Sequence, residues 1–437
     1  MSDTSAINPG GLSSVAPQVA EGEPRRAQRP LKIAVVANTT WYLYNFRRNL
    51  MLYLQAMGHE LVAVGPADRY VDMLGLDGIR HLDVSFNGAG TNPLKEIETV
   101  LRLRRIFRSQ GVDMVFSYTP KGNIYSALAL GGLDSRLVMN VSGLGRVFTR
   151  GGLLAQVVQR LYRESFKRSE WVFFQNEEDR STFVSKGMVN HGKTSRLPGS
   201  GVDLQRFRAS DAPQADRGEP LAFLFVARLL WDKGIGEYVA AARLVRARYP
   251  AARFRVLGSI DKPGAGAVPA QVLQAWVDEG VIDYLGTTDD VRPHLAAADC
   301  VVLPSFYREG VPRSLLEAAA MSLPVITTDA IGCRDTVDDQ LTGLLCKPKD
   351  SADLAKKMFQ LIAVPAADRV LMGKRAREKM ERGFDEKLVL NAYGAVLHRQ
   401  TDFATAGHAL AATGDLDSRT ACVTHGSAGA RASVDKT

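Results

Sequence analysis

The residues best suited to do chemistry are concentrated in one stretch, 305–320, which contains Glu309 and Glu317. The apolar run before this stretch predicts a buried strand of a parallel sheet. Residues 313–321 predict a helix, with Pro312 suited to its first position, where no backbone donor is wasted. Glu309 then lies at the carboxyl end of the strand, the edge at which open α/β sheets bind ligands. The helix start adds free N–H groups and a positive dipole end that favour an anion.

Glu317 has two interpretations. One is an ordinary surface ion pair with Arg313, four residues earlier, although that pair has the less favourable order along a helix. The other follows from its neighbours, which are almost all apolar and indicate a partly buried carboxylate that must hydrogen-bond to something. We therefore expect Glu317 to accept hydrogen bonds from the hydroxyl groups of a ligand.

Two cations, Arg228 and Lys233, follow the apolar segment 221–227 and precede a predicted helix at 236–248. Cationic side chains directly after a strand are most often exposed to solvent and bind no ligand. These two, however, lie at the carboxyl edge of a predicted parallel strand and ahead of a helix start, where phosphates bind. Arginine offers phosphate a planar fork and lysine a point charge. The pair therefore predicts a phosphate site.

Composition limits the class of protein. A chain of 437 residues is too long for one core and predicts two domains. The apolar content of 46% and the charged content of 23% are typical of a soluble globular protein. We find neither a long apolar stretch nor a leader pattern at the start. The four cysteines have no paired spacing and predict free thiols in a reducing cytoplasm, and no spacing fits a structural metal.

The positive charge is unevenly placed. Residues 31–213 carry a net charge of +8, whereas residues 214–400 carry +1. This asymmetry predicts an anionic partner for the first half: a membrane surface, a lipid diphosphate or a nucleic acid. A nucleic-acid binder would need aromatic and basic clusters or a reader motif, and the sequence shows neither, so we expect no nucleic-acid partner.

The glutamates support a family resemblance. Glu309 and Glu317, with Gly-Val-Pro after the first, resemble the motif of retaining glycosyltransferase family 4, whose members have the GT-B fold. Segments 118–125 and 140–148 are similar to a narrower group, the bacterial transferases that extend undecaprenyl-diphosphate-linked sugars, such as the bacillosaminyl-diphospho-undecaprenol N-acetylgalactosaminyltransferases. The resemblance extends from residue 31 to about residue 400 and implies two Rossmann-like domains that face a cleft.

The order of apolar and amphipathic segments agrees with this α/β class, because it predicts two doubly wound parallel sheets. The first domain opens with a strand, a loop at 38–45 and a helix at 46–57, without a Gly-x-Gly-x-x-Gly fingerprint. The expected boundaries are a disordered tail at 1–29, a first domain at 31–213, a second domain at 214–385, a C-terminal helix at 386–400 that packs back on the first domain, and a disordered tail at 401–437.

The resemblance implies a role for each residue of the donor site. Arg228 and Lys233 match the family's diphosphate-binding pair and, with Glu309, are the predicted catalytic residues. Glu317 would accept hydrogen bonds from ribose hydroxyls, and glycines at two strand ends would lie near the base. The predicted donor-binding residues are Glu317, Gly310, Val311, Pro312, Gly258 and Gly286.

The first domain departs from the family pattern. Many members have glycines in the first loop, where this chain has Thr39 and Thr40. Members also often have a histidine at the end of the strand predicted at 114–117, facing the transferred sugar, and this chain has none there. The predicted acceptor-side residues are the substitutes Thr119, Lys121 and Asn123.

Two basic stripes predict a membrane contact. Arg104, Arg105 and Arg108 fall within an arc of roughly 100° on the helix predicted at 94–109. Arg160, Arg163 and Lys167 form a second stripe at helical spacing. Both could be solvated faces whose long stems cover apolar surface. Together with the charge of the first half, they favour contact with anionic lipid.

The resemblance implies a retaining glycosyltransferase that moves a sugar from UDP-N-acetylhexosamine or UDP-hexose to an undecaprenyl-diphosphate-linked saccharide, in the biosynthesis of a surface polysaccharide such as capsule, O-antigen or exopolysaccharide. We expect no metal cofactor, because the only Asp-x-Asp, Asp415–Asp417, lies in the predicted tail. We expect a cytoplasmic protein, peripheral on the inner face of the membrane. One alternative, a nucleotide-sugar 2-epimerase, would need acid and base side chains from both domains. Another, a non-catalytic partner subunit, would be expected to lack Glu309, Lys233 or Arg228.

Overall fold

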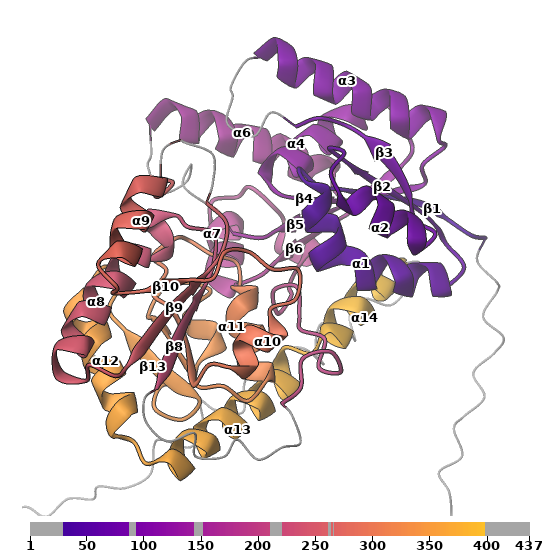
Figure 1. Cartoon of the computed structure of the whole chain (residues 1–437). Coiled ribbons are helices and arrows are strands. Elements are labelled where there is room, and N and C mark those ends of the chain that lie inside the picture. The colour runs from indigo at the N-terminus through magenta and orange to yellow at the C-terminus, as the bar shows by residue number, and fades with distance from the viewer. Residues whose placement is uncertain are drawn as a thin grey trace, which may run out of the picture. The chain divides into compact units, whose positions relative to one another are not determined.

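The structure is a computed structural model that describes residues 29–86, 93–143, 152–209, 221–260, 264 and 266–397. In this part of the chain, two parallel β-sheets are each covered by helices (Figure 1). The predicted domain boundary between residues 213 and 214 lies outside the described residues, as do the predicted tails apart from Arg29. We therefore place the domain boundary only between the last strand of one sheet and the first strand of the next.

The first sheet has seven strands in the order β3-β2-β1-β4-β5-β6-β7, and all neighbouring strands are parallel. They are β1 (Lys32–Val36), β2 (Glu60–Gly65), β3 (Arg80–Asp83), β4 (Met114–Tyr118), β5 (Arg136–Val141), β6 (Trp171–Phe174) and β7 (Thr194–Arg196). The order reverses between β1 and β4, which makes their carboxyl ends a topological switch point. We did not predict β3 and β7, because strands of four and three residues carry too little periodicity.

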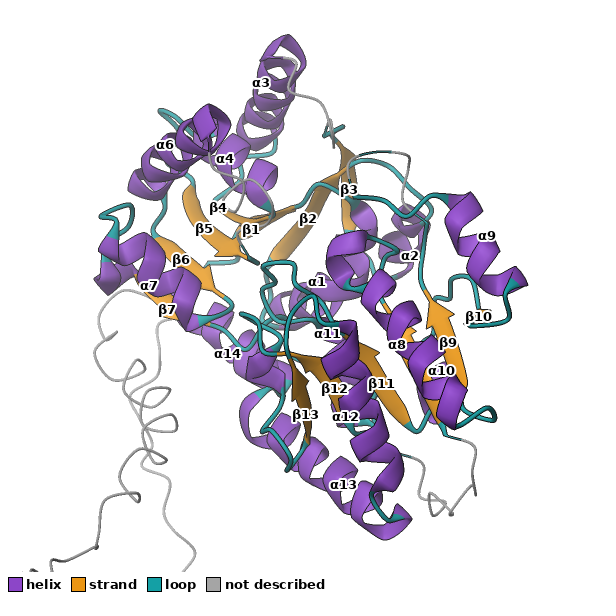
Figure 2. Ribbon diagram, turned by 90° about the vertical axis from the view of Figure 1, so that its left-hand side faces the viewer, coloured by secondary structure: helices purple, strands orange, loops and turns teal. Residues whose placement is uncertain are grey.

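Helices connect these strands and cover both faces of the sheet (Figure 2). They are α1 (Thr40–Ala56), α2 (Tyr70–Leu76), α3 (Pro93–Ser109), α4 (Pro120–Ala129), α6 (Gly152–Arg168) and α7 (Glu177–Ser185), with a 3₁₀ turn η1 (His191–Lys193) before β7. The helix α3 agrees with the predicted helix at 94–109.

The start of α1 corrects a prediction. The helix begins at Thr40 and not at residue 46, so most of the predicted loop at 38–45 is helical. Thr39 caps the helix, because its hydroxyl oxygen accepts a hydrogen bond from the backbone N–H of Tyr42 at 3.2 Å. The aromatic run after Thr39 therefore lies on the first turns of a helix and does not form an open ligand-binding loop.

The second sheet has six parallel strands in the order β10-β9-β8-β11-β12-β13. They are β8 (Ala222–Val226), β9 (Arg253–Leu257), β10 (Asp283–Tyr284), β11 (Cys300–Leu303), β12 (Val325–Thr328) and β13 (Gly343–Cys346). The order reverses between β8 and β11, so this sheet has its own switch point. Its helices are α8 (Ile235–Arg248), α9 (Ala270–Asp278), α10 (Arg292–Ala296), α11 (Arg313–Ala320), α12 (Ser351–Ala363) and α13 (Ala366–Gly383), with 3₁₀ turns η2 (Trp231–Lys233) and η3 (Arg334–Thr336).

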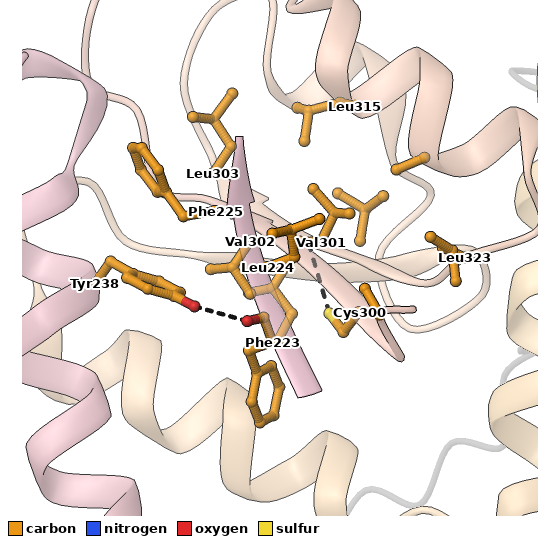
Figure 3. Close-up of a cluster of buried hydrophobic side chains, with 14 of the residues drawn as sticks. Phe223, Leu224, Phe225, Tyr238, Cys300, Val301, Val302, Leu303, Leu315 and Leu323 are labelled. Atoms are coloured by element: carbon orange, nitrogen blue, oxygen red, sulfur yellow. Dashed lines mark hydrogen bonds between the residues drawn. The ribbon is translucent and has the colours of Figure 1, made fainter. Parts of the chain in front are cut away.

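A dry core holds β8 and β11 in place at this second switch point (Figure 3). Every residue of β11 is buried, as are Phe223, Leu224 and Phe225 of β8. Tyr238 of α8 lies in the same core, and its hydroxyl donates to the backbone carbonyl of Phe223 at 2.9 Å. The rigid packing fixes the two loops that leave the carboxyl ends of β8 and β11.

The last helix, α14 (Glu386–Leu397), packs on the first sheet. Asn49 of α1 donates to the Glu386 carboxylate at 2.6 Å, and Asn140 of β5 donates to the hydroxyl of Tyr393 at 3.2 Å. Before α14, Val202 exchanges backbone hydrogen bonds with residues 384 and 386. The chain therefore crosses between the two sheets twice, once between β7 and β8 and again between α13 and α14. None of the helices among the described residues is long and apolar enough to cross a bilayer.

Candidate functional site

The loops after β8 and β11 bring Lys233 and Glu309 together. The ammonium group of Lys233 forms an ion pair with the Glu309 carboxylate, and the hydroxyl of Ser305 donates to the same carboxylate oxygen, Oε1, at 2.9 Å. Only 15% of the Lys233 side chain and 11% of the Glu309 side chain are exposed. Two of the three predicted catalytic residues are therefore in contact, largely buried, at the switch point of the second sheet.

Backbone contacts fix this arrangement. The N–H groups of Phe306 and Tyr307 both donate to the carbonyl of Asp232 at 3.0 Å. Gly234, at a φ of +79°, has its α-carbon against the carbonyl of Pro304, so a side chain at this position would overlap that backbone. The loop that carries Lys233 and the loop that carries Glu309 therefore form one unit.

Arg228 lies exposed at the carboxyl end of β8, in the loop that continues to Lys233. The predicted base-site glycines lie along the same edge and contact each other, because the N–H of Gly258 donates to the carbonyl of Gly286 at 2.8 Å. A side chain at Gly258 would overlap the carbonyl of Ala227. The carboxyl ends of β8, β9 and β10 thus form a continuous backbone-lined surface beside the Lys233–Glu309 pair.

The helix α11 starts at Arg313, with Pro312 as its N-cap, one position before the predicted one. The surface-pair interpretation of Glu317 is half right: the pair forms, but it is not on the surface. Arg313 Nε donates to Glu317 Oε1 at 2.8 Å, and the two side chains are only 13% and 14% exposed. Arg313 also donates to the carbonyl of Asn45 in α1 at 2.6 Å. Burial raises the pKa of Glu317, and the nearby Arg313 partly opposes this effect.

The backbone donors predicted at Gly310 and Val311 are not equally available. The N–H of Val311 already donates to Gln175 Oε1 of the first domain at 3.3 Å. Gly310 is buried against Gln175 and the carbonyl of Ser142. We did not predict Gln175 as a neighbour of this loop, because a lone glutamine after a strand gives no pattern to read.

The acceptor-side residues have separate environments. Asn123 is completely buried and serves the fold: it accepts a hydrogen bond from Ser117 at 2.8 Å and donates to the carbonyl of Asn140 at 2.9 Å. Lys121 forms an ion pair with Glu96 at 2.7 Å. Thr119 occupies the N-cap position of α4 at the first switch point with a φ of +67°, but its hydroxyl makes no capping bond and has no hydrogen-bond partner among the described residues. Only Thr119 keeps the features of a residue that awaits a ligand.

A first-domain histidine was missed. The end of β4 has no histidine, as the sequence indicated. His81 of β3, however, lies beside Thr40 at the start of α1, with 3.1 Å between His81 Nε2 and Thr40 Oγ1. Burial lowers the pKa of His81. The only signal was a histidine in a strand too short to predict.

The predicted membrane residues lie on neighbouring helices, α3 and α6, with α4 between them (Figures 1 and 2). Arg105, Arg108, Arg160, Arg163 and Lys167 are exposed. Arg104 differs: it is half-buried and donates to the carbonyls of Ala129 and Gly131, so its head group caps the end of α4. Lys167 pairs with Glu164 at 2.9 Å. Segment 144–148 of the family resemblance lies outside the described residues.

A cavity of about 280 Å³ lies between the helices α1 and α2 of the first domain and the start of α11 in the second. None of the predicted catalytic residues lines it, but Arg313, the partner of Glu317, does. Asn49 of α1 also lines the cavity and donates hydrogen bonds to two other lining residues, Asp203 and Glu386. The cavity is therefore separate from the Lys233–Glu309 pair.

Comparison with protein families matches each half of the chain to a glycosyltransferase domain. Residues 45–199 match the family described as "Glycosyl transferase 4-like domain", and residues 220–363 match "Glycosyl transferases group 1". The two matched regions correspond to the two sheets described above. The chain is therefore a glycosyltransferase, with a glycosyl transferase 4-like domain in its first half and a group 1 domain in its second.

Individual relatives agree with this class. The chain is 25% identical, over 83% of its length and 97% of the relative's, to N,N'-diacetylbacillosaminyl-diphospho-undecaprenol alpha-1,3-N-acetylgalactosaminyltransferase of Campylobacter jejuni. It is 24% identical, over 74% of its length and 83% of the relative's, to UDP-Gal:alpha-D-GlcNAc-diphosphoundecaprenol alpha-1,3-galactosyltransferase of Escherichia coli. These relatives are transferases, and nothing among them supports the epimerase alternative.

Solved structures show the same fold. Anabaena Alr3699/HepE in complex with UDP and glucose aligns with a TM-score of 0.69 and 17% identity over 85% of this chain and all of that chain. A sucrose-phosphate synthase from Thermosynechococcus elongatus aligns with a TM-score of 0.68 and 19% identity over 84% of this chain and 98% of that one. The predicted GT-B fold class is confirmed.

Proposed function

We propose that the protein transfers a sugar, with retention of anomeric configuration, from a UDP-sugar to a lipid-diphosphate-linked saccharide during the assembly of a surface polysaccharide. The observation that carries the proposal is the meeting of Lys233 and Glu309 at the carboxyl edge of the second sheet, next to the start of α11. The relatives in Campylobacter jejuni and Escherichia coli are named for undecaprenol-diphosphate-linked acceptors, and the Escherichia coli one for a UDP-sugar donor, which supports the same substrate classes here.

The donor would lie along the carboxyl ends of β8, β9 and β10. Its diphosphate would bind Lys233 and Arg228, which supply positive charge where negative charge develops on the leaving group. For this to happen, the ammonium group of Lys233 must turn partly from Glu309 to the phosphate, and Ser305 keeps the Glu309 carboxylate in place meanwhile. Glu309 would hold the hydroxyls of the transferred sugar, and Glu317 those of the ribose.

The chemistry then needs no protein nucleophile. The bond between the sugar's anomeric carbon and the leaving phosphate oxygen breaks as the acceptor hydroxyl attacks on the same face. The acceptor's proton passes to the leaving phosphate oxygen, so UDP leaves protonated and the new glycosidic bond is complete. Acceleration comes from positioning and charge stabilisation, which together can lower a barrier by about 7–11 kcal/mol or more.

Contact with an anionic membrane would bring the protein to a lipid-linked acceptor. The helix α3 presents a stripe of exposed residues at helical spacing, which we call the α3 stripe: Leu94, Ile97, Leu101, Arg105 and Arg108. Three of them are large apolar side chains, and Leu94 is 77% exposed. Leu128 of α4 and Val157 of α6, on the neighbouring helices, are also exposed. Basic and apolar side chains on one helix face favour binding at a lipid interface.

The experiment that tests the proposed function is a screen of UDP-sugars against lipid-linked acceptors, with released UDP as the readout. We expect one donor to give UDP release that depends on an undecaprenyl-diphosphate-linked acceptor, and nuclear magnetic resonance of the product to show the donor's anomeric configuration. Inversion, or release of a nucleotide other than UDP from the preferred donor, would refute the proposal.

A further inference from the structure

The loop that carries Glu309 is held by the first domain. We call residues 304–312 the Glu309 loop. Three side chains from one short segment of the first domain, 175–179, make hydrogen bonds to it. This segment connects β6 to α7, so it also lies at the carboxyl edge of the first sheet. The two sheets therefore meet at the catalytic loop.

The strongest of these contacts is an ion pair between Arg308 and Asp179. Arg308 Nε donates to Asp179 Oδ1 at 2.8 Å, and a second guanidinium nitrogen, Nη2, lies 2.8 Å from the same oxygen. The Asp179 side chain is completely buried, whereas 24% of the Arg308 side chain is exposed. Asn176 fixes the other carboxylate oxygen from 3.1 Å. A buried carboxylate with several donors is a rigid anchor, because each lost contact would leave a charge unpaired.

The other two contacts reach the loop backbone on either side of Gly310. Asn176 Nδ2 donates to the carbonyl of Glu309 at 3.2 Å, and Gln175 Oε1 accepts the N–H of Val311 at 3.3 Å. Gln175 is itself held, because its amide nitrogen donates to Asn140 Oδ1 at 3.2 Å. The backbone before and after Gly310 is therefore fixed by side chains of the other domain.

Glycines allow this close approach. Gly143 has a φ of +110°, and a side chain there would lie 2.8–2.9 Å from the backbone of residues 308–310. Gly310 faces the carbonyl of Ser142 and the amide of Gln175, which leave no room for a side chain. Gly143 thus has a function that a simple turn after β5 would not explain.

We infer that Asp179 and Arg308 are positioning residues for glycosyl transfer: they hold the Glu309 loop against the first domain, so that the donor-binding groups of one domain have a fixed place relative to the acceptor side of the other. The inference rests on the proposed function of Glu309. Neither residue touches the substrate. Their contribution is to geometry, and a misplacement of reacting groups by about 1 Å can cost on the order of 100-fold in rate.

The test uses Arg308→Gln, Asp179→Asn and the double variant in the full chain. We expect each single variant to lower kcat about 10- to 100-fold, while the affinity for UDP, measured by calorimetry, changes by less than about threefold. The double variant should fall no further than the worse single variant, because both changes remove the same contact. Arg308→Lys keeps the positive charge but loses the two guanidinium nitrogens that contact Asp179, so its kcat should lie between those of Arg308→Gln and the wild type.

A second readout does not depend on turnover. Hydrogen exchange of the peptide covering residues 306–312 should become faster in Arg308→Gln, because the Val311 N–H loses its fixed acceptor when the loop loosens. The matched control is Arg136→Gln, which breaks a similar half-buried pair with Glu170 at the opposite, amino-terminal edge of the first sheet. Arg136→Gln should lower the melting temperature about as much as Arg308→Gln does. It should leave kcat and the hydrogen exchange of residues 306–312 as in the wild type.

The outcomes separate the two proposals. Wild-type protein that transfers no sugar from any UDP-sugar contradicts the proposed function, whatever the variants do. Active wild-type protein with unchanged kcat and unchanged exchange in Arg308→Gln overturns the positioning role. So does a loss of kcat equal to that of Arg136→Gln, or additive losses in the double variant. If Asp179→Asn does not fold, Arg308→Gln and Arg308→Lys still decide, because Arg308 is partly exposed.

Discussion

At the scale of single residues, the site is organised by charges that neutralise one another until substrate arrives. Lys233 and Glu309 pair with each other, and Arg313 pairs with Glu317. All four side chains are 15% exposed or less, so each charge would be costly without its partner. A donor that brings its own diphosphate and hydroxyl groups can replace these partners one for one. The pairing explains how four charged side chains can remain largely buried.

The acid side of the pH dependence belongs to Glu317. Burial raises its pKa above the ordinary value of about 4.5. In the proposed function Glu317 accepts hydrogen bonds from both ribose hydroxyls, which only the ionised carboxylate can do, so the affinity for UDP should weaken as the pH falls from 7 through this raised pKa. The folded protein binds this proton more readily than the unfolded chain does, so the group's contribution to the free energy of unfolding falls as the pH rises through the same range.

Calorimetric titration of UDP between pH 5 and pH 8 checks this prediction in the wild type and in Glu317→Gln. The variant should bind UDP on the order of 10-fold or more weakly, because a hydrogen bond to a charged group contributes about 1.5–3 kcal/mol. Its affinity for UDP should also depend much less on pH at the acid end of the range. A variant with wild-type affinity at pH 7 would show that Glu317 is only the partner of Arg313.

At the scale of elements, the helix starts decide what the chain presents to ligands. α11 begins immediately after the Glu309 loop, and α4 begins immediately after Thr119 at the other switch point. α1 begins six residues earlier than predicted, because the capping threonine outweighs an aromatic run that has weak helix propensity. The first loop of the first domain is therefore short, and the carboxyl ends of β1 and β4 lead into helix starts rather than into a glycine-rich loop.

The α3 stripe is an element-scale prediction. Its five residues fall within an arc of roughly 80° on the helix, opposite the buried Leu103 and Phe107. Each cation near an anionic surface contributes about 1 kcal/mol, which salt screens, whereas the apolar side chains contribute a part that salt does not screen. We expect Arg105→Glu with Arg108→Glu to abolish most binding to anionic vesicles at low salt, and Ile97→Ser with Leu101→Ser to remove the binding that survives high salt.

Sedimentation with vesicles at two salt concentrations measures this. The matched control is Lys374→Glu with Arg375→Glu, an equal charge change at exposed positions of α13 in the second domain. Equal losses in the two charge-reversal variants would mean that net charge alone drives binding and that the α3 stripe has no special part in it. Arg104 is not included in the variant, because it caps α4.

At the scale of the whole molecule, the two sheets and their switch points follow from the sequence, and the contacts between the lobes do not. Alternation of apolar strands with helices predicts a doubly wound sheet, and Glu309, Lys233 and Arg228 were placed at the correct edge because parallel strands share one carboxyl edge. Gln175, Asn176 and Asp179 gave no signal. They lie more than 125 residues from the loop they hold, and single polar residues after a strand look like any helix cap.

Three of the predicted site residues have partners in the fold that the sequence did not reveal. Asn123 and Lys121 are polar residues at the right strand end, but the first is buried in a network and the second is paired with Glu96. Arg104 lies at the side of α3, where its guanidinium group donates to the backbone carbonyls of Ala129 and Gly131. In each case a partner distant in the sequence satisfies the side chain, and periodicity along one helix or strand cannot reveal such a partner.

Metal independence is a prediction for the molecule as a whole. Lys233, Arg228 and the start of α11 would provide the positive charge that a divalent ion provides elsewhere. We expect UDP-sugar transfer to be unchanged, within about twofold, by a chelator and by added Mg²⁺ or Mn²⁺. Activity that is lost in a chelator and restored by either ion would contradict this prediction.

The central claim is that the junction of the two loops, with Lys233 at its centre, stabilises the leaving diphosphate. The most direct measurement is the rate of acceptor-dependent UDP release by Lys233→Ala, with Lys121→Ala as a control that removes a lysine paired with Glu96 on the acceptor side. Loss of one charge-assisted contact to the leaving group should cost about 2–4 kcal/mol of transition-state stabilisation, a fall on the order of 30- to 1,000-fold in kcat/KM, with the protein still folded. The Lys121→Ala variant should stay far closer to the wild type. Folded Lys233→Ala protein that releases UDP at the wild-type rate would contradict the account.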